Sequence, residues 1–412
     1  MTHIINRRTM LKGMGAVGLT TLAGCAGLPG GAPQGRDIKL GLLMGVTGGL
    51  AALGPPIVQG AELAVKHVND AGNGFSVTTQ FEDTGTDPTQ GVSGAEALVN
   101  AGYPMICGAL SSSVTIAAAE TVCIPNGVTV CSAASTSPAI STMADNDLVF
   151  RTPPTDALQS LVLADVIKDT LGNSTASTLF LNNDYGTLLS DGFVAAFEGK
   201  GGTVQEQVSF EKQQPSYVAQ LQKALAGGPD ALLIIGYPES GVQILRDFYA
   251  DHDSSVNILV TDGLYDPDLP GKVGNDLANV TGTSPMPAGP GKDFFDTEFE
   301  AAFGAKPSVS YCGYAYDAAA VLILANAAAG SNDGVAIAAQ MRKIANPGGE
   351  VVTPETLAEG VVMAASGTDI DYQGASSAVD FDDNGDLGAA SYEYFKWGSS
   401  GIETISTIDY SG

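Results

Sequence analysis

The sequence predicts an α/β protein of two doubly wound parallel-sheet lobes joined by a three-segment hinge. Its 412 residues exceed the ~250–300 residues that a single core usually supports. From Asp37 onward, short apolar runs alternate with longer segments of helical periodicity, which is the pattern of repeated strand-helix units. Segments rich in proline and glycine interrupt this alternation, and such segments mark crossings between lobes.

The N-terminal residues are predicted to be an export signal that precedes the fold. Arg7 and Arg8 stand before a mostly apolar segment, 10–23, that is too short and glycine-rich for a stable membrane span. Twin arginines at this position are typical of Tat export. The segment ends in the letters LAGC, similar to a lipobox, which implies cleavage before Cys25 and lipid on its thiol. An ordinary secretory signal with an incidental cysteine is the alternative to this Tat lipoprotein signal at 1–24.

A flexible tether and two lobes are expected after the signal. The stretch 25–36 is rich in glycine, proline and alanine and would hold the protein, lipid-anchored, at the extracellular face of the cell membrane. The N-terminal lobe is expected over 37–152 and 288–375, and the C-terminal lobe over 153–287 and 376–412. We expect no later run to span the membrane.

In the first lobe, the continuous apolar run 38–46 predicts a buried strand, and the next segment predicts a helix that stops at Gly72. The apolar face of that helix consists of Ile57, Ala61, Ala64, Val65 and Val68. Further strands are expected at 75–83, 104–110 and 128–133. Further helices are expected at 88–102 and 114–124. Strands connected by helices in this way pair in parallel.

The alternation restarts after the FRTPPTD segment at 150–156. Strands are expected at 177–182, 203–210, 231–236 and 256–262. Helices are expected at 156–170, 185–198, 215–226, 239–250, 292–303, 313–329 and 333–345. A second crossing is predicted at 281–291 and a third at 374–386, and the tail after it has a strand-like pattern.

The charge balance excludes a nucleic-acid partner. The chain has 45 acidic and only 18 basic residues, for a net charge of −27, and no basic stripe to neutralise phosphates. Self-repulsion that favours solubility is one interpretation of this composition. We favour adaptation to very high salt, where a dispersed acidic surface stays hydrated while its self-repulsion is screened.

Two uncharged, hydroxyl-rich segments follow successive strands of the first lobe. The first contains Ser111, Ser112 and Ser113, and the second is SAASTSP at 132–138. A serine cluster at a helix start is often only a cap. Hydroxyls, free backbone N–H groups and a helix N-terminus also form an anion site, and parallel sheets bind ligands at the carboxyl ends of their strands. The two segments together therefore predict a site for a carboxylate or a similar anion.

The second lobe offers an acid and two aromatic residues at equivalent positions. Tyr185 and Tyr237 follow two strands, and Asp262 ends a third. Each tyrosine alone is more often core packing. An acid flanked by aromatic rings fits a cation site. An anion site on one lobe and a cation site on the other describe an α-amino acid zwitterion.

These motifs together resemble the type I periplasmic substrate-binding proteins of ABC importers, specifically the leucine/isoleucine/valine-binding protein family, including members from halophilic archaea. The likeness covers nearly all of 37–400. It is carried by VTGGLAALG, EDTGTDPTQ, GALSSSVT, SAASTSPA, NNDYG, GYPESGVQILR and FDDNGD, in this order and spacing. The resemblance implies a monomer that has no cofactor and no enzymatic activity, and that captures a small amino acid, of branched-chain type above all, for the permease subunits of an importer.

The resemblance also implies a ligand site. Its residues would be Ser112, Ala134, Thr136, Tyr185, Tyr237, Asp262 and Leu53. Ser112 and Thr136 would bind the ligand carboxylate by side chain, with Ala134 contributing backbone. Asp262 would bind the ammonium group, and the two tyrosines would line the pocket. Leu53 stands where relatives often place an aromatic residue in contact with the ligand side chain.

Other interpretations compete with a transport protein. A sensor of amides or urea-type ligands has the same fold, and sequence alone does not separate it from a transport protein. A serine hydrolase is disfavoured because the chain has no G-x-S-x-G elbow, and His67 and His252 are expected on the solvated surface. No spacing of histidines and cysteines suggests a metal site.

Two local features have open alternatives. The segment DFDDNGD at 380–386 has the first ligand positions of a Ca²⁺ loop, but Ser391 stands where the bidentate glutamate is needed, so a turn between strands is favoured. Cys107 and Cys131 lie on strands expected to be adjacent, so a disulfide is conceivable. Buried thiols that act as small hydrophobic groups are the favoured state for the cysteines after Cys25.

Overall fold

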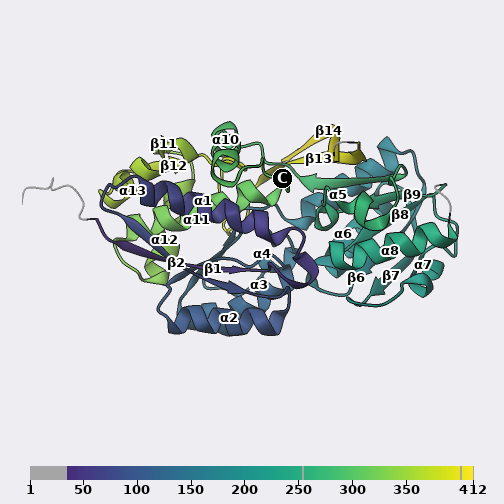
Figure 1. The fold of residues 1–412 in the computed structure, drawn as a ribbon, viewed down its shortest axis with the longest axis horizontal. Coiled ribbons are helices and arrows are strands. Elements are labelled where there is room, and N and C mark those ends of the chain that lie inside the picture. The colour runs from purple at the N-terminus through teal and green to yellow at the C-terminus, as the bar shows by residue number, and fades with distance from the viewer. Residues whose placement is uncertain (1–34, 253–254, 400, 412) are drawn as a thin grey trace, which may run out of the picture. The chain divides into compact units, whose positions relative to one another are not determined.

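The computed structural model describes residues 35–252, 255–399 and 401–411. The predicted signal and nearly all of the predicted tether, including Cys25, lie outside the described residues. The predicted α/β class and the two parallel-sheet lobes are confirmed, because the chain forms a five-stranded and a seven-stranded sheet with helices packed against them (Figure 1).

The first sheet is entirely parallel, with the strand order β2-β1-β3-β4-β5. Its strands are β1 (Asp37–Met44), β2 (Ser76–Asp83), β3 (Met105–Gly108), β4 (Thr129–Ser132) and β5 (Val149–Arg151). The central strand β1 is buried on both faces, as its continuous apolar sequence predicts. Leu42 and Leu43 point to opposite faces and belong to different core clusters, because side chains alternate along a strand.

Helices cover both faces of this sheet, with α2 on one side and α1 and α11 on the other (Figure 1). The helices around this sheet that come early in the chain are α1 (Gly54–Asp70), α2 (Pro88–Asn100), α3 (Ser112–Ala118) and α4 (Pro138–Ser141). Later in the chain, four more helices follow: α10 (Lys292–Phe303), α11 (Tyr311–Ala329), α12 (Gly334–Ala345) and α13 (Leu357–Ala365). A small parallel pair, β11 (Glu350–Val352) and β12 (Ile370–Tyr372), stands beside them.

The second sheet has the order β14-β13-β10-β9-β8-β6-β7. Its parallel strands are β6 (Thr175–Leu181), β7 (Thr203–Phe210), β8 (Ala231–Ile235), β9 (Asn257–Val260) and β10 (Val280–Pro285). Two antiparallel strands, β13 (Ala389–Gly398) and β14 (Gly401–Ser411), extend it at one edge. The helices of this region are α5 (Asp156–Asp165), α6 (Asp184–Gly199), α7 (Val218–Ala224), α8 (Pro238–Asp251) and α9 (Leu269–Val273).

The structure corrects several expectations. The first half of the predicted crossing 281–291 is strand β10, in the interior of the sheet, where the proline at 285 is its last residue. Strands β11 and β12 were not predicted, because they have three residues each. Helix α13 was not predicted either. His67 is not on a solvated face: its side chain is only 15% exposed, and its Nδ1 lies 2.8 Å from the hydroxyl of Tyr316.

Helix α11 also departs from expectation. It is long and apolar enough to span a membrane by length and composition, contrary to the expectation that no later run would be. Because 89% of its most apolar window is buried, it fits the core helix of a globular lobe. It packs against α1, α12 and α13 and against the first sheet.

Candidate functional site

All of the residues predicted to contact a ligand line one small cavity, with a volume of about 30 Å³. The lining consists of Leu50, Leu53, Ile57, Leu110, Ser112, Ala134, Thr136, Tyr185, Tyr237, Asp262, Gly263 and Tyr311. These residues come from both sheets, mostly from the segments that follow the strands. Leu50, Ile57, Leu110, Gly263 and Tyr311 were not predicted.

The wall from the first sheet is uncharged and rich in hydrogen-bonding groups. Ser112 Oγ accepts a hydrogen bond from the backbone N–H of Ser137 at 3.2 Å, so its hydroxyl hydrogen remains available. The backbone N–H groups of Ser112 and Thr136 have no acceptor among the described residues. The helix that follows Ser111 has only seven residues before a π-helical turn, so the hydroxyls and backbone amides, more than a helix N-terminus, are the groups of this wall that could bind an anion.

The opposite wall is built around Asp262, which is buried at the end of β9. Its Oδ1 accepts a hydrogen bond from the Tyr185 hydroxyl at 3.1 Å, and its Oδ2 accepts one from the Tyr311 hydroxyl at 2.8 Å. Burial raises the pKa of Asp262, and the hydrogen bonds from the tyrosines act in the opposite direction. Each carboxylate oxygen has a further lone pair, so this wall can accept hydrogen bonds from a cationic group.

Tyr237 joins the two walls. Its ring stacks on that of Tyr185, with the centroids 5.6 Å apart and the planes 3° from parallel. Its hydroxyl lies 3.2 Å from Ser111 Oγ, which precedes α3 on the first sheet's side. Further contacts between the two regions include a hydrogen bond from Ser137 Oγ to the carbonyl of Asp184 at 2.9 Å. The cavity is therefore enclosed by residues of both sheets.

The rest of the lining is aliphatic. Leu50 and Leu53 precede α1 and Ile57 is in its first turn, while Leu110 precedes α3; all four side chains are buried. A branched aliphatic group would gain about 25 cal/mol per Å² of surface buried against this wall.

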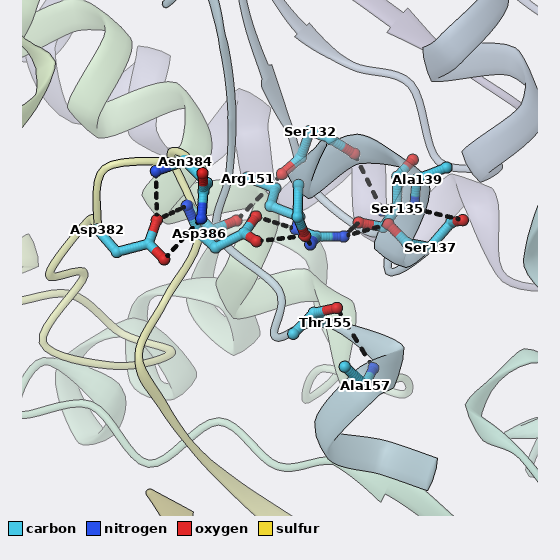
Figure 2. A network of polar contacts seen from close by, with 12 residues as sticks. Ser132, Ser135, Ser137, Ala139, Arg151, Thr155, Ala157, Asp382, Asn384 and Asp386 are labelled. Atoms are coloured by element: carbon cyan, nitrogen blue, oxygen red, sulfur yellow. Dashed lines mark hydrogen bonds and ion pairs between the residues drawn. The ribbon is translucent and has the colours of Figure 1, made fainter. Parts of the chain in front are cut away.

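A second buried network positions the uncharged wall (Figure 2). Arg151, at the end of β5, donates from Nη1 to the carbonyls of Ser137 at 2.8 Å and Ser135 at 3.4 Å, the residues on either side of Thr136. Its Nε donates to Asp386 Oδ1 at 2.6 Å, and its Nη2 donates to Ser141 Oγ at 2.7 Å.

This network also accounts for the Ca²⁺-like sequence 380–386. Asp386 is paired with a guanidinium, and Asp382 Oδ1 accepts hydrogen bonds from the backbone N–H groups of Asn384 and Asp386. Phe381 and Leu387 form an antiparallel bridge around the turn, as the favoured interpretation expects. No cluster of three or more potential metal-ligating residues occurs in the described ranges. Sequence reasoning missed Arg151, although a lone arginine beside an apolar strand end is a signal of a buried ion pair.

The cysteines described by the structure are free thiols. Cys107 and Cys131 are direct register partners on β3 and β4, so the predicted adjacency is present, and both are buried. Burial raises the pKa of both thiols well above the usual range. Cys123 and Cys312 are buried as well. These thiols behave as small core groups.

Comparison with known proteins places this geometry in a family. A model of the periplasmic binding protein family matches 37–356. The chain is 30% identical over 346 residues to Leu/Ile/Val-binding protein homolog 1 of Brucella abortus, covering 82% of this chain and 88% of that protein. It is 29% identical over 356 residues to BasB of Halobacterium salinarum, a chemotactic signal transduction system substrate-binding protein, covering 84% of each.

A solved structure shows the same fold. The leucine binding protein LivK of Thermotoga maritima superposes with a TM-score of 0.77 at 24% identity, covering 90% of this chain and 98% of that one. The sequence resemblance to the family is thereby confirmed, as is the expectation of a non-enzymatic binding protein. The chain belongs to the type I periplasmic binding proteins, in the Leu/Ile/Val-binding protein family.

Proposed function

We propose that the protein captures a small amino acid as its zwitterion, of branched-chain type above all, in the cavity lined by Ser112 and Asp262, and delivers it to an ABC importer. The observation that carries this proposal is the division of the cavity into an uncharged donor wall, an acidic wall and an aliphatic wall. No lysine, arginine or histidine is among the described residues that line it, so neutral donors must bind the ligand carboxylate.

At the carboxylate end, the Ser112 and Thr136 hydroxyls donate hydrogen bonds, and the backbone N–H of Ala134 joins them by leaving Ser132 Oγ, to which it donates at 3.4 Å in this structure. A hydrogen bond to a charged group is worth about 1.5–3 kcal/mol when both partners are otherwise buried. Several such donors share the carboxylate, so the loss of a single one is partly compensated. Arg151 fixes the carbonyls on either side of Thr136 and so keeps its N–H directed at the site.

At the ammonium end, Asp262 supplies the only charge among the described lining residues, and Tyr185 and Tyr237 offer ring faces beside it. The tyrosine hydroxyls fix the orientation of the carboxylate before a ligand arrives, which lowers the ordering cost of binding. A ligand that contacts both walls makes part of its contacts only in the closed arrangement, and it therefore shifts the protein toward closure.

One relative bears on the ligand of this site, and another bears on the step that follows ligand capture. LivK of T. maritima is named a leucine binding protein, in agreement with the aliphatic wall described above. BasB of H. salinarum is named for chemotactic signal transduction, so reporting to a receptor is the second candidate for the step after ligand capture. A neutral amide or urea-type ligand is the alternative at the site itself, and it would leave Asp262 without a cationic partner.

Isothermal titration of the full chain in molar KCl tests the proposal. L-leucine is compared with 4-methylpentanoate, which lacks the ammonium group, and with 3-methylbutylamine, which lacks the carboxylate. We expect leucine to bind and each analogue to bind at least about tenfold more weakly, since each loses a charge-assisted contact. Equal binding of leucine and 4-methylpentanoate would contradict the zwitterion assignment, and binding of acetamide or urea alone would favour the amide alternative.

We also infer Tat export and lipid anchoring from the N-terminal sequence. Replacing Arg7 and Arg8 by lysine is expected to leave precursor in the cytoplasm, because recognition depends on the pair. Cys25→Ala is expected to abolish lipid attachment and to move the protein into the medium. Membrane association that is unchanged in Cys25→Ala would rule out the anchor.

Adaptation to high salt is inferred from the net charge of −27. Self-repulsion among exposed acids is screened only at high ionic strength, so the folded state is expected to be lost on dialysis to low salt. Melting curves over a KCl series measure this dependence. A melting temperature that does not change between low and molar KCl is incompatible with it.

A further inference from the structure

We propose that Ser113 and Ser137 are positioning residues of the binding site, which hold the backbone of Asp184 and so keep the two walls of the cavity together around a ligand. This inference deepens the proposed function, because it names residues that act on affinity without contacting the ligand. It rests on the proposed function wherever affinity is measured, whereas the separation of the two regions can be measured without a ligand.

Asp184 is bound through both of its backbone polar groups. It is the first residue of α6, which packs on β6 and β7 of the second sheet. Its N–H donates to Ser113 Oγ at 3.1 Å, and its carbonyl accepts a hydrogen bond from Ser137 Oγ at 2.9 Å. The first N–H groups of a helix have no partner within that helix, so Ser113 supplies an acceptor that α6 lacks. We call these three residues the backbone clamp.

The clamp belongs to the same two hydroxyl-rich segments that form the donor wall. In each segment, one residue lines the cavity, which is Ser112 or Thr136. The residue that follows it, Ser113 or Ser137, is bound to Asp184 instead. The hydroxyls of these segments are therefore divided between the ligand cavity and the region around the second sheet.

The clamp acts on the acidic wall through Tyr185, the residue after Asp184. The hydroxyl of Tyr185 donates to Asp262 Oδ1 at 3.1 Å, and its ring stacks on that of Tyr237. Because Tyr185 follows Asp184 directly in α6, a fixed Asp184 backbone also fixes the point from which the Tyr185 side chain extends. The clamp thus holds the acidic wall at a set position relative to the donor wall.

Ser137 is itself held by contacts on its own side. Its N–H donates to Ser112 Oγ at 3.2 Å, and its carbonyl accepts a hydrogen bond from Arg151 Nη1 at 2.8 Å (Figure 2). Its Oγ accepts from the N–H of Ala139 at 3.3 Å, which leaves the hydroxyl hydrogen for the carbonyl of Asp184. A donor that is fixed in advance loses little freedom when the two regions meet, so more of its hydrogen bond contributes to closure.

The clamp contacts form only in the closed arrangement, whichever ligand is bound. The observed affinity depends on the closing equilibrium and on the contacts that the ligand makes in the closed arrangement. A change in the closing equilibrium therefore alters the affinity for every ligand by the same factor. A residue that contacts the ligand alters affinity by a factor that depends on the ligand, and this difference separates the two roles.

Isothermal titration of the full chain in molar KCl, with L-leucine, L-isoleucine and L-valine, tests the clamp. We expect Ser113→Ala to weaken the binding of all three by the same factor, about threefold to tenfold, because the closed arrangement loses one hydrogen bond. Ser93→Ala is the matched control, since its hydroxyl donates to the carbonyl of Thr89 within α2, and it should keep wild-type affinity. Unchanged affinity in Ser113→Ala, or a loss confined to one ligand, would overturn the proposal.

A substitution of the other partner removes the same hydrogen bond. Asp184→Pro deletes the N–H that Ser113 accepts, at the first position of a helix, where proline is favoured, and the extended backbone of Asn183 permits a following proline. Asp184→Ala removes the same side chain and keeps the N–H, so comparison of the two variants isolates the backbone change. We expect Asp184→Pro to bind leucine more weakly than Asp184→Ala, and to have little further effect in a Ser113→Ala background. Fully additive losses would contradict a direct contact between Ser113 and Asp184.

Double electron–electron resonance measures closure of the full chain without a ligand. Spin labels at Glu96→Cys on α2 and Glu198→Cys on α6, both exposed positions, report the separation of the two regions in a Cys25→Ala background. We expect a smaller closed fraction in Ser113→Ala than in the unsubstituted labelled chain, and identical distance distributions would show that the clamp does not hold the two regions together. If no amino acid binds in the titrations, the proposed function fails, while this measurement still decides the role of Ser113.

Discussion

Two buried polar regions of the molecule handle charge in opposite ways. The hinge network consists of Arg151, Ser141 and Asp386, together with Asp317, and each of its charged groups has several partners. The cavity has one buried acid, Asp262, and no cation among the described residues that line it. A region in which every buried charged group has hydrogen-bond partners stabilises the fold. A buried charge without an opposite charge beside it indicates a site that a ligand completes.

The hinge network and the cavity also differ in the parts of the chain that they hold together. Asp317, on α11, accepts hydrogen bonds from Tyr372, from the backbone of Ala375 and from Ser376, and so fixes the segment that leads into the third crossing. Arg151 fixes the far end of that crossing through Asp386. Asp262 instead lines a space between residues of the two sheets. Mutations in the first region should change stability, and mutations in the second should change binding.

The largest effect is expected for Arg151→Ala. Removing one partner of a buried ion pair leaves the other charge uncompensated, which costs about 3–5 kcal/mol of unfolding free energy. Denaturant unfolding measures it. Arg342→Ala is the matched control, because its ion pair with Asp147 is partly exposed and should contribute only ~0–1 kcal/mol. Equal losses in the two variants would mean that burial does not distinguish the hinge network.

Gly263→Ala is expected to disturb the cavity wall next. A Cβ at this position would lie 2.4 Å from the carbonyl oxygen of Gly236 and 3.2 Å from the Tyr185 hydroxyl, so the backbone beside Asp262 must shift. Such overpacking costs ~1–3 kcal/mol, and leucine affinity should fall as well. Gly271→Ala, in helix α9 with nothing near its Cβ position, is expected to leave both properties unchanged or to stabilise the protein slightly. If Gly263→Ala binds leucine as tightly as the wild type, the cavity wall beside Asp262 is not closely packed.

The hinge network also predicts a pH dependence of stability. Burial raises the pKa of Asp317 to about 6, against hydrogen bonds that act in the opposite direction. Because the folded protein then binds this proton more tightly than the unfolded chain, the contribution of Asp317 to stability is complete below pH ~4 and is lost as the pH rises through ~6. The slope is at most about 1.4 kcal/mol per pH unit. Unfolding of the wild type and of Asp317→Asn across this window measures it, and identical slopes would show that Asp317 does not titrate there.

The smallest of these effects is expected for Thr136→Ala. Ser112 and the backbone amides still hold the ligand carboxylate, so leucine affinity should fall by only ~0.5–1.5 kcal/mol of binding free energy. Titration calorimetry measures the change, and the melting temperature of the ligand-free variant serves as its control. A loss larger than that of Asp262→Asn would reverse the relative importance assigned to the two walls.

Much of the fold could be predicted because periodicity reports directly on burial. The continuous apolar run of β1 and the one-faced pattern of α1 both correspond to the observed elements. The sequence of β10, VTGTSP, predicts a crossing because it has turn-forming residues, and only its neighbours β9 and β13 make it a strand. Tertiary pairing overrides local propensity in such cases.

The site was predictable where residues directly follow strands. Ser112, Thr136 and Asp262 are in this class, since the ends of parallel strands meet at one edge of each sheet. Tyr311 was missed because it begins a helix after a crossing, and nothing in its local sequence shows which cavity the crossing leads to. Arg151 was missed because its partner Asp386 is distant in sequence.

The most direct test of the central claim is the affinity of Asp262→Asn for L-leucine, measured by isothermal titration of the full chain in molar KCl. The substitution keeps the shape of the side chain and removes the charge that faces the ligand ammonium. We expect at least about tenfold weaker binding, equivalent to about 1.4 kcal/mol or more, with an unchanged or higher melting temperature of the ligand-free protein. Wild-type affinity in a folded Asp262→Asn protein would contradict the assignment of Asp262 as the ammonium partner.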